Sequence, residues 1–279
     1  VSCPISNLVL GGSKTLADIT TSYDNLVKRH GVQMVKDRVA SIDTEKRIVK
    51  LVSGTELGYD RLIVSPGVDF MWESLPGMNK TGAKEQVMHA WKAGEQTLTL
   101  RKQLEAMRDG GVFAMSIPLA PYRCPPGPYE RACQVAEYFS KHKPKSKVLI
   151  LDANEDVTSK GPLFKKAWSD RYKGIVEYRG KHNVTDVDVA TKTLKFEFND
   201  DLKADVLNVI PNMRAGDIAV NTGLATANKR WCDVDFLTFE SKAAKNVHVL
   251  GDSIQIAPAM PKSGHMANQH GKTCAAAVV

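Results

Sequence analysis

The sequence has no long apolar run. No stretch approaches the roughly eighteen consecutive apolar residues that a membrane-spanning helix needs. The first residues also lack the basic and then apolar pattern of a secretory signal. We therefore expect no membrane-spanning helix, and if the protein is exported, we expect its signal to have been removed already.

The cysteines lack the spacing of a metal site. The chain has five of them, at Cys3, Cys124, Cys133, Cys232 and Cys274, and no two form a Cys-x-x-Cys pair. A zinc site is therefore not expected. Because five is an odd number, at least one sulfur has no disulfide partner within the chain.

The basic residues do not form a nucleic-acid-binding stripe. The net charge is +7, but the lysines are scattered and are not interleaved with aromatic residues. With 43% hydrophobic and 25% charged residues, the 279-residue chain is typical of a globular protein of one or two domains. The charge suits an acidic partner protein better than nucleic acid.

A glycine-rich nucleotide loop is also absent. Residues 111–116 have the pattern of a buried strand, and a nicotinamide-binding domain would follow such a strand with Gly-x-Gly-x-x-Gly. Here the strand is followed by the bulky sequence Pro-Leu-Ala-Pro-Tyr-Arg-Cys-Pro-Pro-Gly, which would keep a pyrophosphate away from the next helix. NAD binding is therefore not expected.

A stiff loop carries Cys124. The prolines of Cys-Pro-Pro-Gly-Pro fix the backbone φ angle and remove hydrogen-bond donors, so the loop continues neither a helix nor a central strand. Residues 129–142 then have the pattern of a helix, and residues 147–151 that of another buried strand. Cys124 would thus lie at the carboxyl end of a strand, where ligands gather in open α/β sheets.

Two arginines flank this cysteine. Positive charge on Arg123 and Arg131 favours the thiolate of Cys124, which is the nucleophilic form. The alternative is an unreactive cysteine in a rigid turn, and the residues alone do not decide between the two.

The nine residues from Arg123 to Arg131 closely resemble the segment with one redox-active cysteine in the flavoprotein subunit of flavocytochrome c sulfide dehydrogenase. The resemblance covers essentially the whole chain and is strongest at residues 3–7, 123–131, 249–252 and 261–264. It implies an α/β fold with two glutathione-reductase-like nucleotide-binding domains. The implied division is 1–75 (FAD-binding domain, first part), 76–213 (central NAD-type domain without a nucleotide motif) and 214–279 (FAD-binding domain, second part).

The resemblance also implies FAD as the cofactor and Cys124 as the catalytic redox sulfur. Cys3, which a Ser-Asn pair follows, falls on the position that is joined to the 8α carbon of FAD in that family. The other implied cofactor-binding residues are Gly67, Gly251, Asp252, Lys262, Ser263 and Gly264. Without the resemblance, a cysteine so close to a terminus is more often a free thiol in a frayed segment. The sequence also departs from the family's pattern at one point: Ser65-Pro66 stands before Gly67, where the family has Ala-Thr.

The activity that the resemblance implies is oxidation of sulfide. Electrons would pass from a redox cysteine to FAD and then to a c-type cytochrome subunit, in the periplasm. The family's ADP-binding glycine loop is expected before Val1, and the redox partner of Cys124 after Val279. We therefore expect low activity from this chain by itself.

Two other functions remain open. A related flavoprotein would use a quinone or another sulfur compound, although a membrane quinone enzyme needs an apolar interfacial helix, and none is visible before Val279. Alternatively, the chain is a cofactor-free α/β scaffold that binds a partner protein.

Several further elements follow from periodicity. Residues 15–29 have helical spacing with Leu16, Ile19, Tyr23, Leu26 and Val27 on one face and Gly31 as the stop. Residues 32–57 predict a small antiparallel meander. We expect Cys133 and Cys274 to be small core residues, and His265 and His270 to pack or cap.

Overall fold

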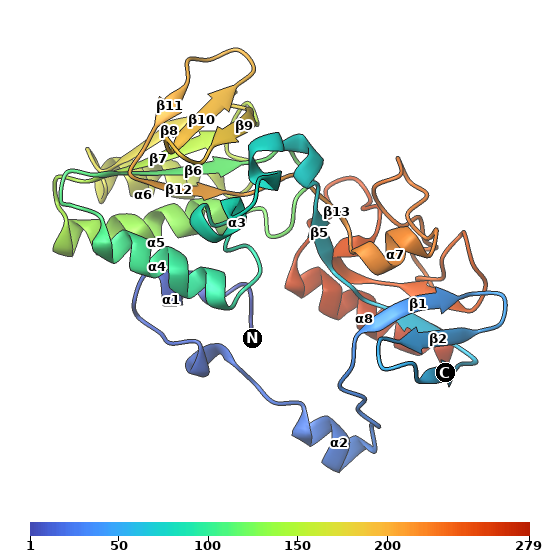
Figure 1. Cartoon of the computed structure of the whole chain (residues 1–279). Coiled ribbons are helices and arrows are strands. Elements are labelled where there is room, and N and C mark those ends of the chain that lie inside the picture. Colours follow the sequence, from blue (N-terminus) through green and yellow to red (C-terminus); the bar gives the residue numbers. More distant parts are fainter. The chain divides into compact units, whose positions relative to one another are not determined.

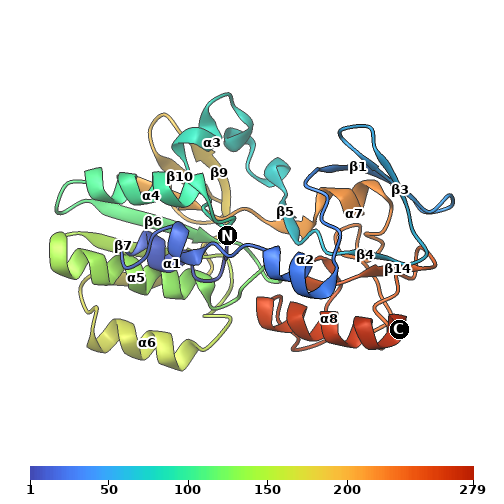
Figure 2. The ribbon, with the colours of Figure 1, turned by 90° about the horizontal axis from the view of Figure 1, so that it is seen from below.

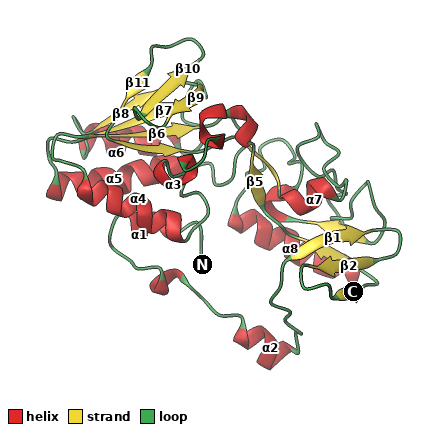
Figure 3. Cartoon of the chain, viewed as in Figure 1, coloured by secondary structure: helices red, strands yellow, loops and turns green.

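The computed structural model describes residues 1–279, which form two compact units. Unit 1 comprises Val1–Thr21 and Met71–Asn212, and unit 2 comprises Ser22–Phe70 and Met213–Val279. Both units are discontinuous in sequence and mix helices with strands (Figures 1 and 3). Residues 1–21 pack in unit 1, whereas the sequence grouped them with residues 22–75. The assignment of FAD and NAD-type roles to these parts remains a prediction.

Unit 1 is built on a parallel four-stranded sheet. Its strand order is β12-β6-β7-β8. The strands are β6 (Val112–Ile117), β7 (Lys147–Asp152), β8 (Val176–Arg179) and β12 (Val206–Val209). Phe113 pairs with Val206 on one side and with Val148 on the other. The central strands are almost wholly buried, which explains why they read as continuous apolar runs rather than as alternating ones.

Helices cover one face of this sheet. They are α1 (Ser6–Leu10), α4 (Glu95–Ala106), α5 (Gly127–His142) and α6 (Gly161–Asp170). α5 packs on β6, β7 and β8, α4 packs on β12, and α1 lies against both α4 and α5 (Figures 1 and 2). α1 is short and has no side-chain cap, so we attribute its stability to this packing.

A small antiparallel sheet covers the other face. It consists of β9 (Val184–Asp188), β10 (Thr193–Phe196) and β11 (Leu202–Lys203), in the order β11-β10-β9. Its buried Val187 and Leu194 share a core with Ala114 and Leu207 of the parallel sheet. The short helices η2 (Trp72–Ser74), η3 (Pro76–Asn79) and α3 (Ala83–Gln86) precede α4. Unit 1 is therefore a layered α/β domain.

Unit 2 contains three small sheets. β1 (Val39–Asp43), β2 (Ile48–Leu51) and β3 (Glu56–Gly58) form the antiparallel meander that the sequence predicts. β4 (Leu62–Val64) pairs in parallel with β14 (Val247–Val249), and β5 (Val68–Phe70) pairs antiparallel with β13 (Met213–Ala215). The remaining helices are α2 (Asp24–His30), α7 (Asp217–Asn221), η4 (Gly251–Ser253) and α8 (Gly264–Val278).

The helix predicted over residues 15–29 is wrong as a single element. The chain forms a short turn, η1 (Ala17–Ile19), and then α2 from Asp24, with an extended break between them. Thr20 donates its hydroxyl hydrogen bond to the Leu16 carbonyl, and such local bonds of Thr and Ser compete with helix propagation. Ile19 is buried, but Tyr23 is 64% exposed, so the predicted apolar face does not form.

Most other predicted elements are confirmed. The helix after Cys124 is α5, the last helix is α8, and Gly31 ends α2 in the left-handed conformation. Cys274 is buried, whereas Cys133 is only half-buried because it lies at the edge of the buried face of α5. None of the helices combines the length and apolarity needed to cross a bilayer.

Candidate functional site

The loop after β6 presents Cys124 at the carboxyl edge of the parallel sheet. Cys124 is half-buried and has a left-handed backbone, with φ of 58°. Its carbonyl accepts a hydrogen bond from the Gly127 N–H at 2.8 Å, at the first residue of α5. A Cβ at position 127 would lie 3.0 Å from the Cys124 sulfur and 2.9 Å from the Trp91 ring. Glycine therefore lets the cysteine loop and Trp91 pack together.

The guanidinium of Arg131 lies in the interior of unit 1. Arg131 is only 2% exposed, and its guanidinium carbon lies 4.7 Å from the centre of the Trp91 ring. It donates hydrogen bonds to four neutral acceptors: Asn7 Oδ1 (3.0 Å), Asn208 Oδ1 (2.9 Å), the His89 carbonyl (3.1 Å) and the Ala90 carbonyl (2.6 Å). These bonds satisfy a buried polar group that would otherwise be costly.

The electrostatic surroundings of Arg131 include both sulfurs of interest. Burial lowers the pKa of Arg131 to about 9, while the nearby groups Cys124, Glu130 and Cys3 act in the opposite direction. Cys124 and Cys3 thus lie within electrostatic reach of one buried guanidinium. The structure brings these two predicted residues, which are 121 positions apart in the sequence, into one neighbourhood of unit 1.

The segment that carries Cys3 is held in place rather than frayed. The Cys3 sulfur accepts a hydrogen bond from the Ala93 N–H at 3.3 Å, and Ser6 Oγ donates to the Cys3 carbonyl at 2.7 Å. Asn7, one turn further on, donates from Nδ2 to the Gly127 carbonyl (3.2 Å) and to Glu130 Oε2 (2.9 Å). These bonds join the start of the chain to the start of α5.

His89 lies buried beside the same guanidinium. Its Nδ1 accepts a hydrogen bond from the Trp91 N–H at 2.8 Å, so the neutral ring carries its proton on Nε2. Burial, followed by the charges of Arg131, Lys92, Arg123 and Lys84, lowers the pKa of His89 to about 3. His89 is therefore neutral at physiological pH and is suited to donating a hydrogen bond, not to carrying charge.

Unit 2 brings together two of the predicted cofactor-binding glycines. Gly67 follows β4 and Gly251 follows β14, and because these strands are parallel neighbours, both glycines lie at the same sheet edge. Both are left-handed, with φ of 70° and 72°, a conformation that favours glycine. Ser253 Oγ donates to the Gly67 carbonyl, which connects the two turns.

Lys262 lies in the interior of the same unit. It is 2% exposed, and its Nζ donates to the carbonyls of Asp252 (2.9 Å) and Ile254 (2.6 Å). The ammonium lies 3.5 Å from the centre of the Trp231 ring, a cation–π contact. Burial lowers the pKa of Lys262 to about 7, although the carboxylate of Asp252 acts in the opposite direction.

Helix α8 begins next to Lys262. Ser263 is its N-cap, and the Ser263 hydroxyl oxygen accepts a hydrogen bond from the Met266 N–H at 3.2 Å. Gly264 is the first helical residue. His270 lies within the same helix and accepts from the Gly251 N–H at 3.2 Å, a packing contact and not a helix cap. Asp252 is thus joined directly to Lys262, and Gly251 is joined to α8 through His270.

Sequence reasoning missed three polar residues of the unit 1 site. Asn7, His89 and Asn208 are all buried and all contact Arg131. For Asn208 a signal existed, because it is a polar residue inside the apolar strand Val-Leu-Asn-Val-Ile. Such a position requires a hydrogen-bond partner in the interior. Asn7 stood out only as part of the Ser-Asn pair after Cys3, and His89 carried no comparable signal.

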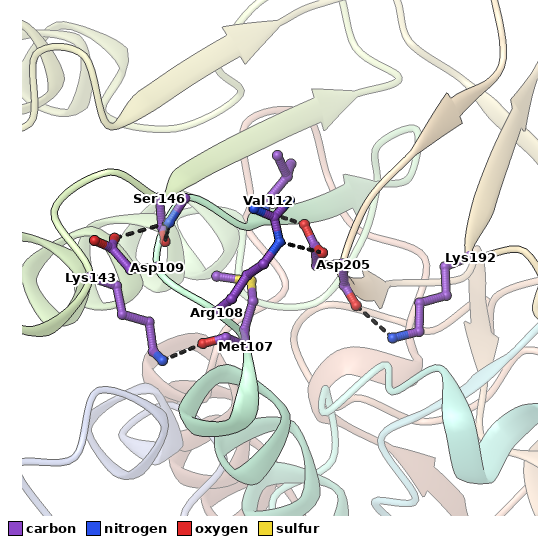
Figure 4. Close-up of polar contacts among 9 residues, drawn as sticks. Met107, Arg108, Asp109, Val112, Lys143, Ser146, Lys192 and Asp205 are labelled. Atoms are coloured by element: carbon purple, nitrogen blue, oxygen red, sulfur yellow. Dashed lines mark hydrogen bonds and ion pairs between the residues drawn. The ribbon is translucent and has the colours of Figure 1, made fainter.

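A separate cavity lies at the opposite, amino edge of the same sheet. It has a volume of about 370 Å³, and Val87, Met107 and Leu207 contribute to its apolar lining. Figure 4 shows polar contacts in this region: Asp205 Oδ2 accepts a hydrogen bond from the Val112 N–H at 2.8 Å, and Lys192 Nζ donates to the Asp205 carbonyl at 2.8 Å. These contacts hold together the starts of β6 and β12, which are remote from the cysteine loop.

Comparison with known proteins finds similar sequences and a similar fold. Residues 97–211 match the family described as "Sulfide dehydrogenase [flavocytochrome c] flavoprotein chain, central". The mitochondrial sulfide:quinone oxidoreductase of Dictyostelium discoideum is 27% identical over 260 residues, which cover 90% of this chain and 56% of that protein. The mouse (Mus musculus) counterpart is 26% identical over 284 residues, which cover 96% and 60%. The chain thus spans somewhat more than half the length of these relatives.

A solved structure shows the same fold over nearly the whole chain. The sulfide:quinone oxidoreductase from Aquifex aeolicus superimposes with a TM-score of 0.80 at 17% identity, covering 99% of this chain and 67% of that one. The chain therefore has the fold of the FAD- and NAD(P)-dependent disulfide oxidoreductases. The match to the sulfide dehydrogenase central-domain family is confined to residues 97–211, which are less than half of the chain.

Proposed function

We propose that this chain is part of an FAD-dependent enzyme that oxidises sulfide, or a related small sulfur compound, at Cys124. The observation that carries the proposal is the position of Cys124. It lies half-buried at the carboxyl edge of the parallel sheet, and its loop packs at Gly127 against the Trp91 ring, over which the buried guanidinium of Arg131 lies at 4.7 Å. It also falls within the segment that matches the sulfide dehydrogenase central domain. Positive charge next to a thiol favours the nucleophilic thiolate.

The residues of unit 2 fit a flavin cofactor. At Gly67 no atom lies within 4 Å of the position that a Cβ would take, and at Gly251 only the Ala267 methyl does, so the backbone at this edge is open to a ligand. We propose that Gly67, Gly251, Asp252, Lys262, Ser263 and Gly264 hold FAD, and that Cys3 is its covalent attachment. FAD, when bound, accepts electrons in pairs and releases them singly.

The chain's own residues have three roles in this proposal. Cys124 supplies the sulfur that would form an S–S bond with the sulfur of the substrate, and the two electrons released by this oxidation would be taken up by FAD when it is bound. Arg131 keeps positive charge beside that sulfur and joins α1, α5 and β12 through its hydrogen bonds. His89 stays neutral, so it adds no charge to the site, and it fixes the loop before α4 through its bond from the Trp91 N–H.

For the electron acceptor we propose a c-type cytochrome subunit, as in the resembling family, and a periplasmic location. The net charge of +7 suits an acidic protein surface. A quinone is the alternative acceptor, because the curated relatives are named sulfide:quinone oxidoreductases.

The test is steady-state turnover of FAD-loaded protein with sulfide and either acceptor. We expect sulfide-dependent reduction of cytochrome c, and loss of that reduction in Cys124→Ser. The control, Cys133→Ser, changes another half-buried cysteine of unit 1 and should keep wild-type turnover. Reduction of a water-soluble quinone, without reduction of cytochrome c, would favour quinone as the acceptor. A protein that takes up no FAD would favour the cofactor-free scaffold.

A further inference from the structure

The cavity at the amino edge of the parallel sheet has walls from separate segments of unit 1. The end of α4 contributes Met107, the turn after β9 contributes Val189, and the start of β12 contributes Val206 and Leu207. Met107, Val206 and Leu207 are buried, so the inner wall is apolar. The volume of about 370 Å³ falls within the range of about 300–1,000 Å³ that small-molecule sites have. The cavity is therefore large enough for a small organic ligand.

The wall at the end of α4 is held in place by its own contacts (Figure 4). Lys143 Nζ donates to the carbonyl of Met107, and also to that of Glu105 at 3.0 Å. Carbonyls at the end of a helix otherwise lack a partner. A Cβ at position 111 would lie 2.6 Å from Met107 Cγ, so glycine there lets the Met107 side chain pack closely. This wall does not have to be ordered by a ligand, which favours binding.

Two cationic side chains of the lining lie on either side of Asp205 (Figure 4). Arg108 Nε lies 3.8 Å from Asp205 Oδ1, and Lys192 Nζ donates to the Asp205 carbonyl, a neutral acceptor, at 2.8 Å. The other carboxylate oxygen of Asp205 accepts from the Val112 N–H. Because 3.8 Å is too long for a hydrogen bond, Arg108 and Lys192 both keep donors for an anionic group at the mouth of the cavity.

Other carboxylates do not occupy this position. Four belong to residues close to the lining in the sequence: Glu85, Glu105, Asp109 and Asp188. Glu105 forms an ion pair with Arg101 at 2.7 Å, and Asp109 and Asp188 accept hydrogen bonds from backbone N–H groups. Glu85 is exposed, and the exposed Lys102 and Lys203, which also neighbour lining residues, offset its charge. None of the four lines the cavity, so recognition here depends on direct contact with Arg108 and Lys192, not on the overall charge of the region.

We propose that this cavity binds a small carboxylate with an apolar body, of the size of a medium-chain fatty acid. The apolar body lies against Met107, Val206 and Leu207, and the carboxylate accepts hydrogen bonds from Arg108 and Lys192. A planar guanidinium suits a carboxylate because two parallel N–H groups match its two oxygens. The site is separate from the Cys124 loop, and the inference does not rest on the proposed function.

The test is a titration with octanoate, below the concentration at which it forms micelles. The protein is isotope-labelled at the methionine methyl groups, and the NMR signal of Met107 is assigned from its loss in Met107→Leu. We expect a saturable shift of the Met107 methyl, while that of Met213, in unit 2, stays unchanged. Octanol, which lacks the charge, and acetate, which lacks the apolar chain, should each bind at least about tenfold more weakly.

Variants at the mouth of the cavity locate the headgroup. Arg108→Gln/Lys192→Gln should weaken octanoate binding at least about tenfold and leave octanol binding unchanged. Both side chains are exposed, so the fold should be retained. The matched control is Arg171→Gln/Lys195→Gln, which changes an exposed arginine and an exposed lysine of unit 1 outside the lining and should bind octanoate like the wild type.

The absence of a saturable Met107 shift would overturn the proposal, and so would an equal shift at Met213, which would mean non-specific binding. Octanol binding as tightly as octanoate would show that the headgroup is not recognised. Acetate binding as tightly would show that the apolar lining contributes nothing. Equal octanoate affinity in the wild type and Arg108→Gln/Lys192→Gln would also contradict the proposal. None of these measurements uses flavin, sulfide or turnover, so their outcome is independent of the proposed function.

Discussion

Arg131 on α5 donates a hydrogen bond from Nε to Asn7 Oδ1 on α1 at 3.0 Å, across 124 positions of the sequence. Through this contact a buried cation joins the segment of Cys3 to the helix that follows Cys124. Asn7 completes the connection with its own bond to the Gly127 carbonyl. The segments that carry Cys3 and Cys124 are therefore held together by the same hydrogen bonds of Arg131 and Asn7.

Replacing Arg131 should strongly destabilise the fold. Arg131→Met removes the donors of four hydrogen bonds and leaves their acceptors buried, so we expect a loss of at least about 3 kcal/mol in the free energy of unfolding. Arg131→Lys keeps the charge but lacks the planar fork, and should lose less. The measurement is urea denaturation.

The matched control for that experiment is Arg171→Met. Arg171 has a side chain 70% exposed and a long ion pair with Glu137 at 3.8 Å, and such surface pairs contribute less than about 1 kcal/mol. Equal losses for Arg131→Met and Arg171→Met would show that the Arg131 network does not hold unit 1 together.

The buried ammonium of Lys262 should make stability depend on pH. Its pKa is about 7 in the folded protein, against an ordinary value of 10.5. Between these values the unfolded chain binds a proton that the folded protein has released, so the free energy of unfolding rises with pH in this window. Below the folded pKa both states are protonated, and the cost of burying the charge is fully present.

The difference between wild type and Lys262→Met isolates this effect. From about pH 7 to about pH 9, wild-type stability should gain on the variant by up to about 1.4 kcal/mol per pH unit. Urea denaturation at several pH values gives the difference directly. A constant difference across this range would mean that Lys262 keeps its ordinary pKa and is not buried as a charge.

His89 should remain neutral in mildly acidic solution. Because its pKa is lowered to about 3 from 6.5, its ring signals in NMR should not change as the pH is lowered through 6.5. Their assignment comes from the signal lost in His89→Gln. The unfolded chain binds this proton first, so His89 lowers stability as the pH falls below 6.5. A titration midpoint near 6.5 would contradict the buried, cation-surrounded position of His89.

Cys3 should carry covalent flavin if the resemblance extends to the attachment site. After denaturation and removal of small molecules, protein isolated with its cofactor should keep a flavin spectrum and show the intact mass of the chain plus one FAD. Cys3→Ser should lose both while keeping any flavin that is bound without a covalent bond. Retention of covalent flavin in Cys3→Ser would place the attachment elsewhere.

The elements around Cys124 could be predicted because local sequence dictates them. Proline at the first turn and an apolar face fix the start and the burial of α5. Residues 15–29 show the limit of periodicity: Leu16, Ile19 and Tyr23 have helical spacing, but spacing does not show whether a surface exists to bury them.

The buried hydrogen bonds of Arg131 could not be predicted from local sequence. An arginine on a helix is exposed by default, and Arg131 is buried only because Asn7, Asn208 and two backbone carbonyls converge on it from three distant segments. Such convergence is a property of the tertiary fold. The turns at Gly67 and Gly251 could be predicted from the sequence, because a glycine that follows an apolar strand is a local signal of a turn.

The most direct measurement is a single anaerobic mixing of FAD-loaded protein with sulfide, without any acceptor, followed by the visible absorbance of the flavin. The proposal predicts that sulfide bleaches the wild-type flavin, slowly but completely, and that Cys124→Ser stays oxidised while Cys133→Ser matches the wild type. Bleaching of Cys124→Ser at the wild-type rate would contradict the claim that sulfide is oxidised at Cys124.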